Sequence, residues 1–253
     1  MLSFAGSPLG RGAAAVLIGY FRARLENPTN VPRGGGALLV SNHSTFGLDS
    51  FVLTSLIWTE CSRYPRFLVE RNLAKLRGFR AFFEGVAALP GTRDVAVAAL
   101  ASGELVGVYP GGINDSLKLR TSKNRLLWET RSGFVQVAMR ARVPIIPIAG
   151  VGIDDMYHVV YREPWIGRRL FGSERYDLPL ALGRWGTPLP RRVPLRFVVL
   201  PAVGTGGNPD DPEAVESIRA LTHQAISAEL TRESHGQSGG DQAPPATKSR
   251  CRR

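Results

Sequence analysis

The stretch SNHSTFGLDS, residues 41–50, holds a histidine and an aspartate that could share acid–base chemistry. A histidine can accept a proton from a hydroxyl near neutral pH, because the unperturbed pKa of imidazole is about 6.5. A carboxylate beside it fixes the tautomer and stabilises the imidazolium that forms. Since His43 and Asp49 are six positions apart, they can share a site only if a loop precedes the first turn of a helix, and Gly47 makes such a turn available. A lone histidine–aspartate pair at this distance is usually a chance pairing on a loop; the other interpretation is that His43 is a general base oriented by Asp49.

A second candidate site is PGGIND, residues 110–115, which follows the apolar run ELVGVY. Two consecutive glycines after a strand let backbone N–H groups converge on an anion or a developing oxyanion. The alternative is a plain tight turn, which Pro-Gly-Gly forms readily. The sequence has no glycine-rich loop ending in Lys-Ser or Lys-Thr, which excludes a P-loop.

Two further motifs are weaker. GQSGG, residues 236–240, matches the nucleophile-elbow pattern, but Ser238 follows an expected helix rather than a strand and is not expected to be a nucleophile. In GIDDMYHVVY, His158 follows Asp154 and Asp155, a set that could bind a metal. Three ligands within five residues of one loop give poor tetrahedral geometry, so we favour a structural loop and predict no metal site.

Short apolar runs alternate with helix-like segments along the chain. The expected strands are residues 36–42, 66–70, 85–89, 104–110, 143–152 and 194–201. The expected helices are residues 50–60, 72–83, 92–102, 131–141 and 211–232, with Thr92 as an N-cap and Gly103 as a stop. This alternation predicts an α/β fold with a largely parallel central sheet covered by helices on both faces. Because sites form at the carboxyl ends of parallel strands, the loops that carry His43, PGGIND and residues 152–155 are expected at one sheet edge.

The composition is that of a basic chain. Its 253 residues are 43% hydrophobic and carry a formal net charge of +11, with a pI near 10.4. Such a charge attracts phosphorylated molecules or an anionic membrane surface, although it can also belong to a protein that is simply basic. The basic residues are spread along the chain without a clear pattern of stacking aromatics, so we expect no nucleic-acid partner.

The N-terminal region contains the apolar segment AAAVLIGYF, residues 13–21, between Arg11 and Arg22. No window of the sequence reaches the roughly 20 apolar residues of a membrane-spanning helix. Basic flanks and a terminal Tyr-Phe pair suit a helix that lies in the bilayer interface, and an ordinary core helix is the alternative. We therefore expect an N-terminal membrane-interfacial helix over residues 1–25, one domain over residues 26–232, and a disordered basic tail over residues 233–253.

Three ordered blocks resemble the glycerolipid acyltransferase (PlsC-like) superfamily, most closely its diacylglycerol and monoacylglycerol acyltransferase-like branch. The blocks are LLVSNHSTFGLD, GVAALPGTRDVAVAALASGELVGVYPGG and GFVQVAMRARVPIIPIAGVG, and the resemblance covers roughly residues 20–205. It implies that residues 26–232 are an acyltransferase domain that moves a fatty acyl group from acyl-CoA to a lipid hydroxyl, with acyl-CoA as co-substrate and no bound cofactor.

The resemblance also implies roles for individual residues. His43 would deprotonate the acceptor hydroxyl, which attacks the thioester directly, and Asp49 would orient His43. Thr45 stands where the family often has a serine. Pro110, Gly111 and Gly112 would hold part of the acceptor or the thioester oxygen.

Two departures from the family pattern matter: the first concerns the assignment of Asp49, and the second concerns the acceptor. Five residues rather than four separate the histidine from the aspartate. Pro-Gly-Gly-Ile stands where phosphate-binding members have Glu-Gly-Thr-Arg, so the arginine of that block is absent. Lys118 and Arg120 follow later in the chain, but neither stands at the position of that arginine. We therefore expect a neutral acceptor, a partial glyceride or a long-chain alcohol, rather than a lysophospholipid. The open alternatives are a lysophosphatidic acid acyltransferase, a thioesterase or lipid hydrolase on the same fold, and a non-catalytic basic peripheral membrane protein. The expected location is the cytoplasmic face of a membrane, peripheral or monotopic.

Overall fold

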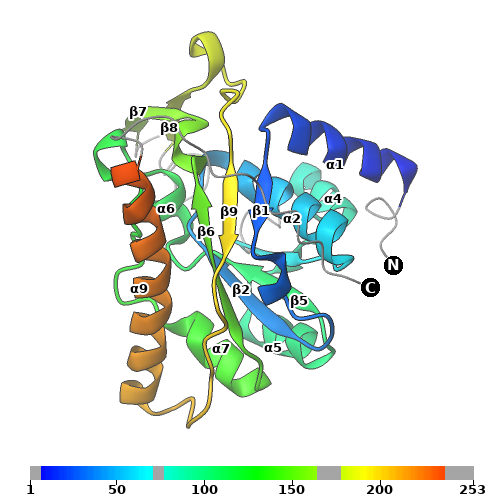
Figure 1. The fold of residues 1–253 in the computed structure, drawn as a ribbon, viewed down its shortest axis with the longest axis vertical. Coiled ribbons are helices and arrows are strands. Elements are labelled where there is room, and N and C mark those ends of the chain that lie inside the picture. Colours follow the sequence, from blue (N-terminus) through cyan, green and yellow to red (C-terminus); the bar gives the residue numbers. More distant parts are fainter. Residues whose placement is uncertain (1–6, 71–76, 164–177, 237–253) are drawn as a thin grey trace.

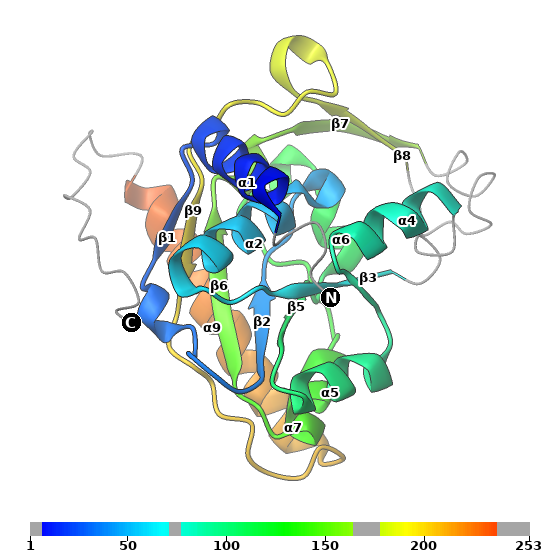
Figure 2. The same cartoon turned by 90° about the vertical axis from the view of Figure 1, so that its right-hand side faces the viewer.

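The computed structural model describes residues 7–70, 77–163 and 178–236. Its centre is a seven-stranded sheet with the strand order β1-β9-β6-β2-β5-β3-β4 (Figures 1 and 2). The strands are β1 (Arg24–Glu26), β2 (Ala37–Ser41), β3 (Arg66–Val69), β4 (Leu89–Pro90), β5 (Leu105–Val108), β6 (Ile145–Val151) and β9 (Arg196–Val199). Strands β6, β2, β5, β3 and β4 pair in parallel, whereas β9 is antiparallel to β6 and parallel to β1. The predicted, largely parallel sheet is confirmed.

Helices cover both faces of this sheet, as predicted. Helices α1 (Pro8–Tyr20) and α2 (Leu48–Cys61) lie on one face, and α5 (Arg93–Ala101), α7 (Gly133–Ala141) and α9 (Pro212–Gly236) lie on the other (Figures 1 and 2). Successive side chains of β2 point to opposite faces of the sheet, so β2 contributes residues to the core on each face. Leu38 and Val40 belong to the core beneath α5, α7 and α9, while Ala37 and Leu39 belong to the core beneath α2.

Shorter elements complete the described chain. They are α4 (Arg77–Gly85), α6 (Gly112–Ser116) and the 3₁₀ turns η1 (Pro28–Asn30), η2 (Thr45–Gly47), η3 (Arg120–Ser122), η4 (Ile153–Asp155) and η5 (Arg184–Gly186). Strands β7 (His158–Glu163) and β8 (Leu178–Leu182) form a separate antiparallel pair. The expectation that Asp154, Asp155 and His158 share one loop is wrong for His158, because β7 begins at this residue and pairs with β8.

The predicted strand over residues 85–89 is also wrong. Helix α4 continues to Gly85, and Ala87 has a φ of 56°, which a strand cannot contain, so only Leu89 and Pro90 join the sheet. Thr92 does cap α5, because its side chain accepts a hydrogen bond from the Val95 N–H at 3.3 Å. The first residues of the helix predicted over 72–83 lie outside the described residues.

The two domain boundaries expected at the termini fall inside regular elements. The boundary after residue 25 lies within β1, which pairs with β9, and the boundary after residue 232 lies within α9, which continues to Gly236. The rest of the expected disordered tail, with Ser238, lies outside the described residues. Helix α1 packs along α2 and exposes one side to solvent, including Leu9 and Val16. No helix in the described part of the chain is both long enough and apolar enough to cross a membrane.

Candidate active site

His43 and Asp49 meet at the end of β2 in spite of their separation along the chain. His43 Nδ1 lies 3.3 Å from Asp49 Oδ2 and 3.2 Å from Oδ1. The chain between them turns because Phe46 and Gly47 both have a positive φ, 63° and 70°, and α2 begins at Leu48. This is the loop and helix turn that the six-residue spacing required. It places Asp49 in the first turn of α2, where the helix dipole favours a carboxylate.

The Asp49 carboxylate is fully buried and accepts hydrogen bonds from two neighbours. Its Oδ1 accepts from the Ser44 backbone N–H at 3.2 Å and from the Ser44 hydroxyl at 2.5 Å. Burial alone would raise the pKa of Asp49, but the charge of His43 and the hydrogen bonds from His43 and Ser44 outweigh it and lower the pKa below its usual range. A neutral imidazole that donates from Nδ1 to such a carboxylate keeps its lone pair on Nε2, which is the arrangement of a general base.

Tyr109 fixes the plane of the His43 ring. The two rings are stacked with centroids 3.9 Å apart and 10° between their planes, and Phe67 stacks on the other side of Tyr109 at 5.2 Å. Phe67 reaches this position because Gly107 has no side chain: a Cβ there would lie 2.4 Å from the Phe67 ring. The Tyr109 hydroxyl is buried and interacts with the Asp49 carboxylate, although its contacts with the described residues do not reach regular hydrogen-bond geometry. Burial, and next the nearby Asp49 carboxylate, raise the pKa of Tyr109 well above its usual value.

A buried ionic chain holds the backbone of the histidine. The His43 N–H donates to Asp115 Oδ2 at 3.0 Å, and Lys118 Nζ lies 3.3 Å from Asp115 Oδ1 and 3.1 Å from Asp154 Oδ2. Burial alone would lower the pKa of Lys118, but the two carboxylates raise it, so the ammonium stays charged. Asp115 approaches because Gly111 lacks a side chain; a Cβ there would lie 2.3 Å from the Asp115 Cβ.

The Pro110-Gly111-Gly112 turn lies beside the histidine, at the end of β5. Arg131 Nη1 donates to the Gly111 carbonyl at 2.6 Å and to the Pro110 carbonyl at 3.4 Å. The Gly112 N–H donates to the Tyr109 carbonyl at 3.0 Å, so this amide closes the turn. The Arg131 guanidinium therefore stabilises the turn through two of its carbonyl groups. Of the two glycine N–H groups, that of Gly112 is already hydrogen-bonded within the turn.

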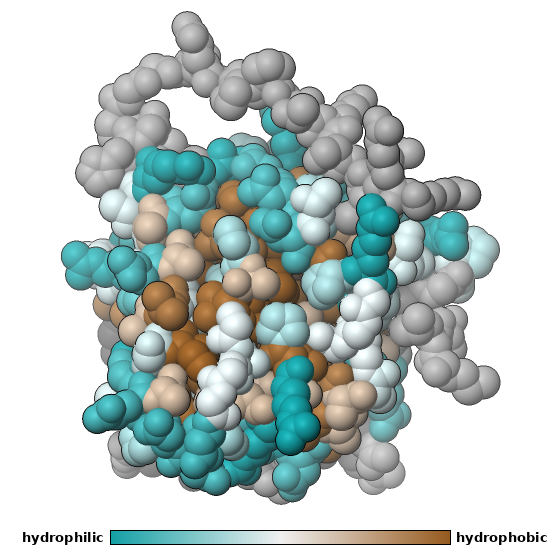
Figure 3. Space-filling view, turned by 60° about the horizontal axis from the view of Figure 1, so that its bottom comes forward, coloured by the Kyte–Doolittle hydropathy of each residue, from teal (hydrophilic) through white to brown (hydrophobic). Residues whose placement is uncertain are grey.

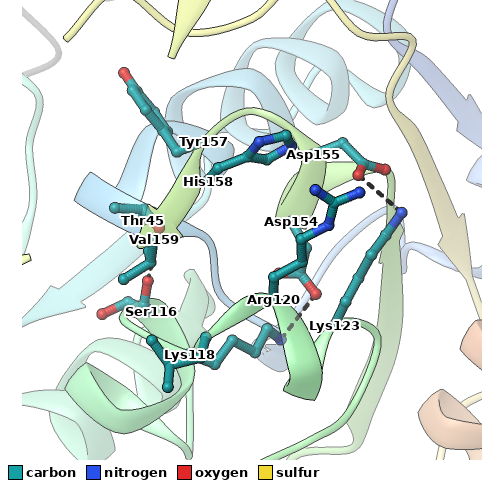
Figure 4. Close-up of a pocket in the computed structure, with 11 residues that line it drawn as sticks. Thr45, Ser116, Lys118, Arg120, Lys123, Asp154, Asp155, Tyr157, His158 and Val159 are labelled. Carbon is teal, nitrogen blue, oxygen red and sulfur yellow. Dashed lines mark hydrogen bonds and ion pairs between the residues drawn. The ribbon is translucent and has the colours of Figure 1, made fainter. Parts of the chain in front are cut away.

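Thr45 links the histidine loop to α6 and to a pocket. Its hydroxyl donates to the Ser116 carbonyl at 2.9 Å. Both residues line a cavity of about 90 Å³ (Figure 4). The other lining residues are Lys118, Leu119, Arg120, Lys123, Asp154, Asp155, Tyr157, His158 and Val159. The pocket adjoins the histidine loop at the same sheet edge and carries both signs of charge.

The acidic residues near His158 form ion pairs with basic side chains. Asp155 pairs with Lys123 at 2.8 Å, Asp154 belongs to the buried ionic chain, and His158 Nε2 contacts Arg191. Burial lowers the pKa of His158, and the cationic side chains of Arg191 and its neighbours lower it further. Within the described residues, no group of three or more His, Cys, Asp or Glu side chains could hold a metal ion.

The site contains four residues for which the sequence predicted no individual role: Tyr109, Lys118, Arg131, and Asp115 at the end of the PGGIND motif. Tyr109 could have been suspected, because it stands immediately before Pro110 where β5 ends. The contacts of Asp115, Lys118 and Arg131 join residues far apart in the loops, and no local pattern in the sequence predicts those contacts.

Comparisons with known proteins show the family and the fold of the chain. A family model described as Acyltransferase matches residues 22–151. A Bos taurus protein named "DGAT1/2-independent enzyme synthesizing storage lipids" is 30% identical over 220 residues, which cover 86% of this chain and 60% of that protein. The Mus musculus protein of the same name is 31% identical over 183 residues, which cover 72% of this chain and 53% of that protein. The chain thus spans between half and two thirds of the length of these relatives.

A solved structure shares the fold. The crystal structure of the 1-acyl-sn-glycerophosphate (LPA) acyltransferase PlsC from Thermotoga maritima superposes with a TM-score of 0.55 at 13% sequence identity. The match covers 92% of this chain and 86% of that one. At such low identity the likeness concerns the arrangement of helices and strands, and it confirms the predicted fold class.

Proposed function

Because the chain belongs to the acyltransferase family, we propose that it transfers a fatty acyl group from acyl-CoA to the hydroxyl of a lipid. The observation that carries this proposal is the pair formed by His43 and the buried, charged Asp49, joined at 3.2–3.3 Å. That pair leaves His43 Nε2 to accept a proton, and it stands at the sheet edge where the Pro-Gly-Gly turn also arrives.

In the proposed reaction, His43 Nε2 takes the proton of the acceptor hydroxyl while the oxygen attacks the thioester carbonyl carbon. The carbon–sulfur bond then breaks, and the imidazolium returns the proton to the leaving CoA thiolate. Asp49 stabilises the imidazolium between these two steps. The products are an ester and free CoA, and the mechanism requires no bound metal or cofactor. Pro110 to Gly112 are proposed to hold part of the acceptor or the thioester oxygen, and Thr45 to shape the adjoining wall.

We propose a neutral alcohol, a partial glyceride or a long-chain alcohol, as the acceptor. The Pro-Gly-Gly-Ile block supplies no arginine to grip a phosphate, and the relatives named for storage-lipid synthesis support a neutral product. A lysophospholipid acceptor is the second candidate. The observation that favours it is the position of Arg120 and Lys123 in the pocket that adjoins the histidine loop (Figure 4).

We further propose that the protein works at the cytoplasmic face of a membrane as a peripheral or monotopic protein. The basic charge of the chain suits an anionic leaflet, and α1 lies along α2 with Leu9 and Val16 exposed. A membrane-bound position would bring the catalytic edge to an acceptor that resides in the bilayer.

The decisive experiment measures the release of free CoA from palmitoyl-CoA by the purified protein and by His43→Ala. The acceptors are none, diacylglycerol, a fatty alcohol and lysophosphatidic acid. Release that depends on a neutral alcohol and disappears in the variant supports the proposal. Release without any acceptor indicates a thioesterase, and dependence on lysophosphatidic acid overturns the neutral-acceptor assignment. Equal inactivity of both proteins, with both binding vesicles, indicates a non-catalytic membrane protein.

A further inference from the structure

A short loop beyond β8 exposes a tryptophan next to the catalytic edge. This Trp185 loop, residues 183–190, projects at the end of the molecule where β7, β8 and α1 also lie (Figures 1 and 2). Trp185 is 78% exposed and Leu189 is 48% exposed. The loop is closed by two backbone hydrogen bonds, Gly183 N–H to Thr187 at 2.8 Å and Arg184 N–H to Leu189 at 2.7 Å. It is therefore an ordered element that holds its indole ring in solvent.

Tyr157 connects the Trp185 loop to the histidine loop, and Tyr20 connects it to α1. The Tyr157 hydroxyl donates to the Pro188 carbonyl at 3.1 Å, and the Tyr157 ring meets Phe46 edge-on at 5.2 Å. On the other side, the Tyr20 hydroxyl at the end of α1 donates to the Pro190 carbonyl at 2.7 Å. Phe46, three residues after His43, is itself 58% exposed. Phe46 and Trp185 are thus exposed aromatic residues on two loops that are linked through Tyr157.

Both of these exposed aromatic residues have a left-handed backbone. Phe46 has a φ of 63° and Trp185 a φ of 56°, a conformation that bulky side chains seldom adopt because it brings the Cβ close to the carbonyl oxygen. In water the fold thus keeps two large apolar rings exposed at the expense of backbone strain. Contact with an apolar phase would bury the rings and offset that strain.

The charge around the Trp185 loop identifies the kind of surface it fits. From Leu178 to Leu195 the sequence contains three arginines and no acidic residue. The Arg184 guanidinium carbon lies 4.0 Å from the centroid of the Trp185 ring, and Arg192 Nε donates to the Tyr20 carbonyl. An indole beside guanidinium groups suits the interface of an anionic bilayer, where the ring enters the acyl boundary and the cations meet lipid phosphates.

We propose that the Trp185 loop docks the catalytic edge onto an anionic lipid bilayer. Trp185 and Leu189 enter the interface, Arg184 and Arg192 contact lipid phosphates, and the histidine loop faces the leaflet through Phe46. Exposure alone does not select this surface, because apolar residues also gather at the opposite end of the molecule, within a hydrophilic rim (Figure 3). The adjoining arginines and the link to the histidine loop select it. The inference rests on the proposed function only in that it takes the acceptor as a membrane lipid.

The first test measures sedimentation of the full chain with phosphatidylcholine vesicles, with and without about one third phosphatidylglycerol. The variant is Trp185→Gly, which removes the ring and tolerates the left-handed backbone, so the fold is preserved. The matched control is Leu221→Gln, which removes an apolar side chain, 53% exposed, from α9 on the other face of the sheet. We expect wild type to prefer anionic vesicles, and we expect Trp185→Gly to bind them about tenfold more weakly. Leu221→Gln should bind as wild type does.

The second test locates the indole ring. Lipids brominated along their acyl chains quench tryptophans that reach the bilayer, and Trp185→Phe keeps an apolar ring without the indole. We expect vesicles to quench part of the wild-type emission and that part to be missing in Trp185→Phe. Equal quenching in the two proteins would show that another tryptophan makes the contact, and the proposal would then be wrong.

Outcomes for docking and for catalysis are distinguishable. Activity toward a vesicle-embedded acceptor should fall with binding in Trp185→Gly, whereas activity toward a short-chain, water-soluble alcohol should stay at the wild-type level. If wild type is inactive with every acceptor but Trp185→Gly still loses vesicle binding, docking stands and the acyltransferase proposal fails. If the enzyme is active and Trp185→Gly binds vesicles as wild type does, docking fails alone. If wild type binds neither kind of vesicle, docking onto a bilayer is excluded as well. A protein partner would then be the candidate to cover the Trp185 loop.

Discussion

The ring of Tyr109 lies flat on the ring of His43, with centroids 3.9 Å apart and 10° between the two planes. Histidine rotates about two side-chain bonds, and Asp49 restrains the ring only through Nδ1. The stack restrains the plane of the ring as well, so the direction of Nε2 is set before any substrate arrives. The geometry of this site therefore involves three side chains, of which the dyad is only the part that the sequence reveals.

Replacement of Tyr109 should separate the role of its ring from that of its hydroxyl. Tyr109→Phe keeps the stack and removes a hydroxyl that interacts with the Asp49 carboxylate without regular hydrogen-bond geometry, so we expect near wild-type turnover and little change in stability. Tyr109→Leu removes the stack, and we expect kcat to fall about tenfold, with little change in KM. Steady-state CoA release and thermal unfolding measure both effects. A loss in Tyr109→Phe as large as that in Tyr109→Leu would assign the function to the hydroxyl.

Asp49→Asn should preserve the shape of the site and remove its charge. The amide no longer stabilises an imidazolium and can hold the wrong tautomer of His43, so we expect kcat to fall by about a hundredfold or more. CoA release at saturating acceptor is the measurement, and circular dichroism verifies the fold. Ser50→Ala is the matched control, because its hydroxyl donates to the Gly47 carbonyl in the same helix turn and makes no contact with the dyad. If Asp49→Asn is as active as wild type, the pair of His43 and Asp49 does not act together in catalysis.

Lys118 and Lys123 form a matched pair for a stability test. Both line the same pocket, but the Lys118 side chain is 4% exposed between two buried carboxylates, whereas that of Lys123 is 35% exposed beside the half-exposed Asp155. Lys118→Met leaves buried carboxylates without their cation, and we expect it to lower the free energy of unfolding by about 3–5 kcal/mol. Lys123→Met should change it by less than about 1 kcal/mol. Urea unfolding gives both values. Similar losses in the two variants would contradict the distinction between buried and exposed pairs.

The free energy of unfolding should depend on pH through two histidines whose pKa values are lowered in the folded chain, His158 and His223. Burial, then nearby arginines, lower the pKa of His158 and of His223 below their unfolded value near 6.5. At a pH between the folded-state and unfolded-state pKa values, the unfolded chain binds more protons than the folded chain. The free energy of unfolding therefore stays at its full value above about pH 7 and decreases as the pH drops below about 6.5. Urea unfolding at pH 7.5 and pH 5.5 should show a smaller decrease for the double variant His158→Gln and His223→Gln. An unchanged decrease would show that other groups cause it.

The central part of the fold could be predicted because its signals are local. Strands β2, β5 and β6 are continuous apolar runs, which is typical of strands buried on both faces, and Thr92 precedes its helix with a recognisable cap. The predicted strand at residues 85–89 failed because an alanine-rich run fits a helix end as readily as a strand. The pair β7–β8 could not be predicted, because each strand is stabilised by a partner that a local window does not contain.

The site also has a part that local sequence signals predict and a part that depends on contacts between distant residues. The types and spacing of His43 and Asp49 indicated a dyad, and the strand order placed the Pro-Gly-Gly turn beside it. The contact of Asp115 with the His43 amide joins residues 72 positions apart, and Phe67 can stack on Tyr109 only because Gly107 has no side chain. Such contacts are set by how loops pack on one another, and no spacing rule describes them.

The hydrogen bond from the His43 amide to Asp115 has a consequence for exchange with solvent deuterium. Loops that carry functional residues usually open locally, and their amides exchange on a fast timescale. Here the amide donates to a fully buried carboxylate that is bound in turn to Lys118 and, through it, to Asp154. Releasing that one proton requires the loops after β2, β5 and β6 to separate together. The His43 amide is therefore expected to exchange as slowly as the centre of the sheet and to report the global opening of the protein.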